Sequence, residues 1–134
     1  MTASSALAAR PAQESWTVRA LRAVVVLHVI ALLAQAVTAG LLLSSPGGRP
    51  LHLASAIAVT VLGLLHLVLA ILVWRPGGGP AKFVPLAASM LVFTVVAAAL
   101  GMAHVKAVHV PLGVMLFGGG VMQLQRVMSR PATA

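Results

Sequence analysis

Four long apolar runs, separated by short polar connections, make up most of this chain. They are Ala23–Leu43, Leu51–Trp74, Phe83–Met102 and Val108–Leu124. A helix needs about 20 apolar residues to cross a bilayer, within a range of roughly 17 to 25, and each run meets that length. The pattern therefore predicts an all-α integral membrane protein with four spanning helices, at about 21–44, 51–74, 82–103 and 107–125.

The connections between the runs are short and contain turn-forming residues. Ser44–Pro50 and Arg75–Pro80 are rich in Pro and Gly, and the third connection, from about Ala103 to Ala107, is shorter still. Short connections make consecutive helices antiparallel neighbours. We therefore expect an up-down-up-down bundle over residues 18–128, in which the second and fourth helices are diagonal partners. Residues 1–17 are predicted to be a disordered cytoplasmic tail, and residues 129–134 a second cytoplasmic tail.

Composition narrows the classes of function. Hydrophobic residues make up 60% of the chain and charged residues 7%, against about a quarter charged in a soluble domain. The absence of cysteine from the sequence excludes disulfides and thiolate chemistry. Glu14 is the only acidic residue, whereas most hydrolytic and proton-pumping mechanisms need carboxylates in or near the membrane. An enzyme is therefore the less favoured class.

The net charge of +8 does not indicate nucleic acid as a partner, because the basic residues are scattered along the chain. Arg49 and Lys106 lie in the first and third connections. The other seven basic residues flank the termini and the second connection: Arg10, Arg19, Arg22, Arg75, Lys82, Arg126 and Arg130. Cytoplasmic loops carry an excess of Lys and Arg. We therefore expect a multi-pass protein of the plasma (cytoplasmic) membrane with both termini in the cytoplasm.

Histidines are the candidate functional residues inside the apolar runs. His52 and His66 are fourteen residues apart, which is close to four helical turns, so they face the same way about 21 Å apart along the axis. The predicted topology places His52 and His109 at similar depth near the outer surface. An ionisable side chain within hydrocarbon is a functional-site candidate by default. Because paired imidazoles commonly hold haem iron, we expect His52 and His109 to be the axial ligands of a haem b.

A short internal repeat places small residues below each of these two histidines. The motif His52-x3-Ala56-x6-Gly63 matches His109-x3-Gly113-x6-Gly120. Offsets of 4 and 11 return to nearly the same helix face. We expect the four small residues to leave room for the flat macrocycle, and the two helix hairpins to be related by an axis along the membrane normal. Ordinary packing of small residues between membrane helices, or chance similarity, is the alternative.

His28 and His66 lie deeper in the predicted membrane and are candidates for a second haem. They belong to adjacent helices, and the repeat position that matches His66 is Gln123. The favoured interpretation is therefore a buried histidine that hydrogen-bonds to Gln35, Thr60 or a backbone carbonyl.

A rival metal site would use histidines alone. Zinc or copper accepts three imidazoles, and His52, His104 and His109 could converge at the outer surface. A typical zinc site would add a carboxylate or a thiolate, and neither is available here. His104, beside Lys106, is expected to be a solvated surface residue.

The segments around His52 and His109 resemble one four-helix half of a haem A synthase. They read Leu51-His52-Leu53-Ala54-Ser55-Ala56 and Val108-His109-Val110-Pro111-Leu112-Gly113, each following a helix that ends near Gly40 or Gly101. The resemblance covers roughly residues 20–128 and implies that the two histidines hold haem b. The family's catalytic carboxylate has no counterpart in Leu43–Leu51, and these 134 residues contain one half rather than two. Haem A synthase activity is therefore not expected. The spacing of His52 and His66 is also similar to that of di-haem cytochromes b, in which two helices each carry such a pair.

Together these features predict a small membrane protein that binds one haem b for electron transfer or haem handling. A respiratory or quinone-linked membrane protein is the expected partner, and self-association into a homo-oligomer stays open. Two histidine ligands leave the iron no open position for substrate, which favours electron transfer over catalysis. The alternative, from a different class, is a cofactor-free membrane subunit, assembly factor or small transporter.

Overall fold

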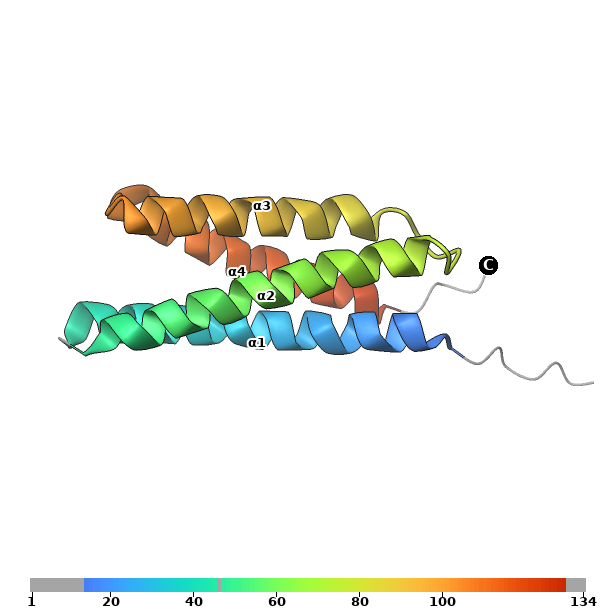
Figure 1. The fold of residues 1–134 in the computed structure, drawn as a ribbon, viewed down its shortest axis with the longest axis horizontal. Coiled ribbons are helices and arrows are strands. Elements are labelled where there is room, and N and C mark those ends of the chain that lie inside the picture. Colours follow the sequence, from blue (N-terminus) through green and yellow to red (C-terminus); the bar gives the residue numbers. More distant parts are fainter. Residues whose placement is uncertain (1–13, 46, 130–134) are drawn as a thin grey trace, which may run out of the picture.

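The protein is an antiparallel bundle of four helices. The structure, a computed structural model, describes residues 14–45 and 47–129, so the predicted tails lie largely outside the described residues. The helices are α1 (Trp16–Ser44), α2 (Gly48–Trp74), α3 (Phe83–Met102) and α4 (Lys106–Met128). The α1–α2 and α3–α4 turns lie at one end, which we call the turn end (Figure 1). The α2–α3 connection and both ends of the described chain lie at the other, which we call the terminal end. The predicted all-α fold class is confirmed.

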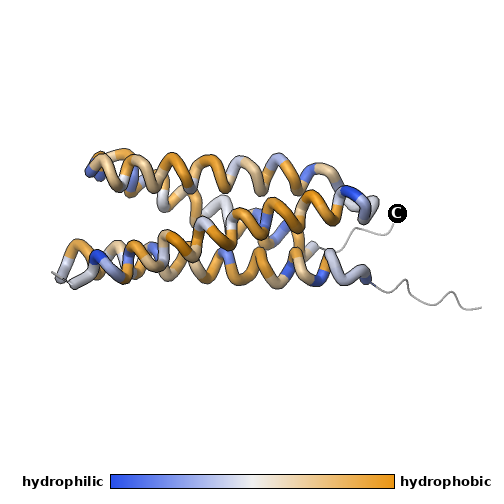
Figure 2. The backbone as a smooth tube through the Cα atoms, viewed as in Figure 1, coloured by the Kyte–Doolittle hydropathy of each residue, from blue (hydrophilic) through white to orange (hydrophobic). Residues whose placement is uncertain are grey.

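All four helices are long and apolar enough to cross a membrane. Apolar residues make up most of each helix between its ends (Figure 2). Many large ones point outward, including Val114 and Met115, which are 68% and 71% exposed. An apolar surface this extensive is an association site in water, whereas in lipid it is the ordinary state of a bundle exterior. The chain is therefore a multi-pass membrane protein.

Three helices extend beyond the apolar runs, and one of them, α2, begins at Gly48 rather than at Leu51. α1 begins at Trp16, inside the predicted tail, and the Ser15 hydroxyl caps it by accepting a hydrogen bond from the Val18 backbone N–H at 3.4 Å. It also continues past Gly40 to Ser44, so Gly40 does not end the helix. α4 runs on to Met128 rather than ending near residue 125. Arginine and glutamine are good helix formers, so a helix need not stop where its apolar run stops.

The packing order of the helices puts α2 and α4 on a diagonal. Among the described residues, α1 packs against α2 and α4, and α3 packs against the same two helices. Within residues 48–74 and 106–128, no Cα atom of α2 lies within 8 Å of a Cα atom of α4. The predicted diagonal is therefore confirmed, and side chains from α2 and α4 can meet only across the centre of the bundle.

The buried core fills the terminal end and the middle of the bundle. One cluster consists of Leu21, Val25, Ala70, Val73, Ala87 and Val127. A second cluster consists of Ala31, Leu32, Val59, Met90, Ala97 and Leu116. Leu32 is the last buried residue of α1, and Leu116 is the first of α4. The apolar core therefore stops well short of the turn end, where polar side chains take its place.

Candidate functional site

His52 and His109 meet at the turn end of the bundle. Their ring centroids are 6.2 Å apart and the ring planes are inclined by 78°. Both rings are half-buried, and they come from the diagonal helices α2 and α4. Two imidazoles on opposite sides of one metal ion, with metal–nitrogen bonds of about 2 Å, hold their centroids about 6 Å apart. The two rings are therefore close enough together that one metal ion could be held between them.

The orientation of His109 is fixed by α3. Its Nδ1 lies 2.7 Å from the Ala97 carbonyl oxygen, and since a carbonyl can only accept, Nδ1 carries the proton. Nε2 is then the nitrogen that keeps a lone pair. A Cβ added at Gly101 would lie 3.0 Å from His109 Cε1, so the glycine lets the ring lie close to α3. An imidazole held through Nδ1 by a carbonyl, with Nε2 left free, is the usual arrangement of a metal-ligating histidine.

The orientation of His52 is fixed by α1. The Gln35 side-chain amide donates to His52 Nε2 at 3.2 Å, and His52 Nδ1 donates to the Thr38 hydroxyl at 3.3 Å. Ser55 completes the network, because its hydroxyl donates to Gln35 Oε1 and lies 2.7 Å from Thr38 Oγ1. Both ring nitrogens of His52 thus have protein partners. A metal ion at Nε2 would replace the Gln35 amide and leave the Thr38 contact in place.

The four small residues predicted to share a slot with these histidines do not lie together. Gly113 is exposed, and a Cβ there would meet nothing within 4 Å. Ala56 lines a shallow groove between α2 and α3. A Cβ at Gly63 would lie 3.4 Å from His28 Cε1, and one at Gly120 would lie 2.9 Å from Leu32 Cδ1. The prediction that these four small residues form one strip beside the two histidines is therefore wrong. Gly63 and Gly120 instead make room for side chains of α1, and the sequence patterns of α2 and α4 contain no information about those side chains.

His28 and His66 form a second pair, deep in the bundle between α1 and α2. The side chains are 2% and 3% exposed, their Nδ1 atoms are 3.5 Å apart, and the ring centroids are 5.7 Å apart. The partners expected from the sequence are engaged elsewhere, because Gln35 contacts His52 and the Thr60 hydroxyl donates to the Ala56 carbonyl. Rings in hydrogen-bond contact within a filled core leave no room for a macrocycle, so the pair does not fit a second haem.

Two buried side-chain polar atoms lack hydrogen-bond partners, one in this deep pair and one on α3. Within the described residues these buried atoms are His28 Nε2 and the Thr94 hydroxyl oxygen. Gln123, at the repeat position that matches His66, is buried and donates from Nε2 to the Leu86 carbonyl at 2.9 Å. Gln123 thus bonds to a backbone carbonyl, whereas His66 bonds to another histidine, so the two matching positions of the repeat have different partners.

His104 is exposed in the turn between α3 and α4, as expected, and its φ is 59°. Across residues 14–45 and 47–129, no three His, Cys, Asp or Glu side chains lie close enough together to hold a metal ion. The alternative site made by His52, His104 and His109 is therefore not formed.

The fold and these contacts define the chain as a four-helix membrane bundle with two internal histidine pairs. Comparison with known protein families, with curated proteins and with solved structures finds no match.

Proposed function

We propose that this protein binds one haem b between His52 and His109 and serves electron transfer or haem handling beside a respiratory or quinone-linked membrane partner. The single observation that carries the proposal is the meeting of the two imidazoles from diagonal helices, with ring centroids 6.2 Å apart. The limited extent of the apolar core also supports the proposal. Around His52 and His109, at the turn end, α1 and α4 bury no large core side chain.

Haem b, when bound, supplies one-electron redox chemistry. The chain's own residues hold and orient the two ligands. Ala97 and Gly101 present Nε2 of His109, and Thr38 holds His52 through Nδ1. For haem to bind, Gln35 would have to release Nε2 of His52, and it could keep its hydrogen bond with Ser55. Two histidine ligands leave no open coordination position, which suits electron transfer better than catalysis.

The direct test is the haem content of the protein purified in mild detergent from haem-replete cells. The proposal predicts about one haem b per chain by the pyridine haemochrome assay, falling to a small fraction in H109A. His104→Ala is the matched control, because this exposed histidine lies only five residues away from His109 in the sequence. A wild-type protein without haem would contradict the proposal.

A cofactor-free membrane subunit, assembly factor or small transporter is the second candidate. The observation in its favour is that both nitrogens of His52 already have protein partners. In that case the network of Gln35, Thr38, His52 and Ser55 joins α1 to α2 by hydrogen bonds, as polar residues often do between membrane helices. Purified protein without a Soret band would favour this candidate.

We also propose that both termini face the cytoplasm, on the basis of the seven-to-two distribution of basic residues. Reporter fusions at Gly47 and Gly78 test this orientation, and a Cβ at either glycine would meet nothing within 4 Å. A periplasmic signal from Gly47 and a cytoplasmic signal from Gly78 are expected. The reverse pattern would place His52 and His109 on the cytoplasmic side instead.

A further inference from the structure

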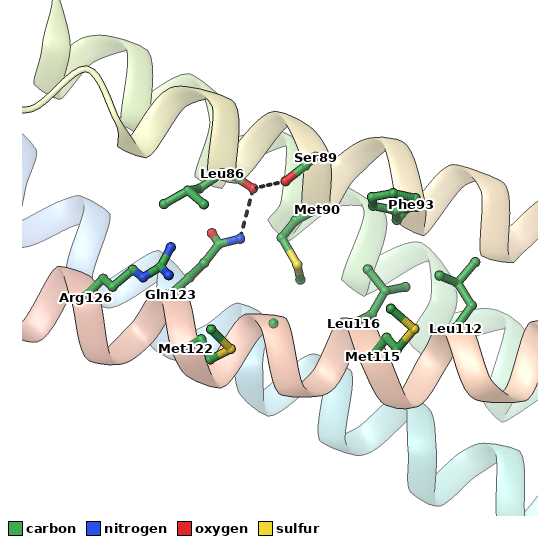
Figure 3. Close-up of a pocket in the computed structure, with 11 residues that line it drawn as sticks. Leu86, Ser89, Met90, Phe93, Leu112, Met115, Leu116, Met122, Gln123 and Arg126 are labelled. Carbon is green, nitrogen blue, oxygen red and sulfur yellow. Dashed lines mark hydrogen bonds between the residues drawn. The ribbon is translucent and has the colours of Figure 1, made fainter.

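An apolar groove runs along the outside of the bundle between α3 and α4, away from both histidine pairs. Its volume is about 260 Å³. Its walls are lined by methionine, leucine and phenylalanine side chains, including Met90 and Phe93 from α3 and Met115 from α4 (Figure 3). From Leu112 to Arg126 the groove follows α4 for fifteen residues, a rise of about 21 Å. A groove of this length and lining suits a single hydrocarbon chain.

Arg126 provides the only charge among the residues that line this groove. It lies in the last turn of α4, is exposed, and is at the terminal end of the groove (Figure 3). The other two polar residues that line the groove, Gln123 and Ser89, both donate hydrogen bonds to the Leu86 carbonyl at 2.9 Å. The groove is therefore apolar along its length and cationic at one end.

No aspartate or glutamate of the chain is available to form an ion pair with Arg126. Glu14 is the only acidic residue in the sequence, and it is paired with Arg22 at 2.6 Å. An anion for Arg126 must come from a group other than an aspartate or a glutamate of this chain. At the end of a membrane helix, the abundant anion is the phosphate of a lipid headgroup, and basic sites between helices on one membrane face bind such groups.

We propose that the α3–α4 groove binds one anionic phospholipid from the leaflet at the terminal end. An acyl chain lies against the methionine and leucine side chains, and the headgroup phosphate pairs with the Arg126 guanidinium. Methionine side chains adapt readily to an irregular hydrocarbon chain, and guanidinium binds phosphate oxygens in a bidentate manner. The site is separate from the histidine pair at the turn end, because none of the residues that line it is a hydrogen-bond partner of His52 or His109.

A second groove on the bundle serves as an internal comparison. It lies between α2 and α3 and has a similar volume of about 250 Å³. Its lining residues are Leu53, Ala56, Ile57, Thr60, Val61 and Ala98, none of which is charged. This groove can take a hydrocarbon chain, but it has nothing with which to select an anionic headgroup.

Native mass spectrometry of the full chain in detergent, with equal amounts of phosphatidylglycerol and phosphatidylcholine added, tests the proposal. We expect the wild-type protein to retain phosphatidylglycerol about fivefold more than phosphatidylcholine, and R126Q to lose that preference. Arg75→Gln is the matched control, because Arg75 lies at the same end but stacks on Trp74 at 5.0 Å, outside the groove. R75Q should therefore keep the wild-type preference.

Gly119→Leu tests the groove itself. Gly119 lines it, and a Cβ there would already lie 3.3 Å from Met90 Sδ, so a leucine would fill the space and lower retention of phosphatidylglycerol by a similar factor. Equal retention of both lipids by the wild type would overturn the proposal. So would an unchanged preference in R126Q, an equal loss in R75Q, or a co-purifying neutral quinone in place of phospholipid. The R126Q comparison stands even if G119L does not fold, because Arg126 is exposed.

Discussion

The two histidine pairs have similar ring geometry and very different surroundings. The centroids are 6.2 Å apart for His52 and His109 and 5.7 Å apart for His28 and His66, and in both pairs the rings are nearly perpendicular. The first pair joins diagonal helices where the apolar core has ended, whereas the second joins adjacent helices inside that core. The separation of two imidazoles therefore does not define a cofactor site unless the space around them is also available.

The two pairs also differ in the partners of their ring nitrogens. His109 bonds to a backbone carbonyl and keeps Nε2 available, whereas His28 and His66 bond to each other. The deep pair satisfies one nitrogen of each ring within hydrocarbon, where an unpaired polar group is costly. Structural stability is therefore the role that the contacts of the deep pair support, and ligation is the role proposed for the pair at the turn end.

The largest effect on stability is expected when only one member of the deep pair is removed. His66→Ala leaves the buried His28 without its hydrogen-bond partner and opens a cavity, so it should lower the free energy of unfolding by about 3 kcal/mol. Replacing both histidines with leucine removes the unpaired polar group and should recover most of that loss. Unfolding in detergent with increasing SDS measures both changes. A single variant as stable as the wild type would show that the pair contributes nothing to packing.

A smaller effect on stability is expected when a leucine replaces one of the two repeat glycines of α4. Gly120→Leu must displace Leu32, since a Cβ alone would lie 2.9 Å from its Cδ1, and overpacking of this kind costs about 2 kcal/mol. Gly113→Leu is the matched control, because it is exposed and a Cβ there meets nothing within 4 Å. It should change stability by about 0.5 kcal/mol or less. The same SDS unfolding assay compares them, and equal costs would refute the different placement of the two glycines.

The smallest effect on stability is expected for substitution of Gln35, whose side-chain amide donates a hydrogen bond to His52. Gln35→Leu removes hydrogen bonds between α1 and α2, which are worth about 0.6 kcal/mol each on average in membrane helices. It also removes the group that competes for Nε2 of His52, so the haem content should stay at the wild-type level or rise. Haem content and unfolding are measured on the same preparation. A loss of haem in Q35L as large as that in H52A would show that Gln35 supports the site rather than competing for it.

The sequence predicted the four spans, their order and the diagonal because each depends on run length and turn length alone. The sequence also predicted that His52 and His109 lie at the same end of the bundle, because each follows a short turn at that end. It did not identify Gln35 and Thr38 as partners of His52, or Ala97 and Gly101 as the support of His109. Those contacts depend on how each helix is rotated about its axis. In lipid, outward-facing and inward-facing side chains are equally apolar, so hydropathy does not fix that rotation.

The same physical reason explains the error about the strip of small residues. The spacing of Gly63 and Gly120 along the second and fourth helices predicts a slot between these two helices. The space beside each glycine is instead filled by His28 and Leu32 of α1. A repeat within two helices carries no information about the side chains that a third helix inserts between them.

The visible spectrum of the dithionite-reduced protein, compared across single histidine variants, tests the central claim most directly. Six-coordinate low-spin haem held by His52 and His109 should give sharp α and β bands in the wild type and in H104A. H52A and H109A should each give a five-coordinate spectrum or none, whereas H28A and H66A, where they fold, should keep the wild-type bands. A wild-type protein without a Soret band, or low-spin bands unchanged in both H52A and H109A, would contradict the account.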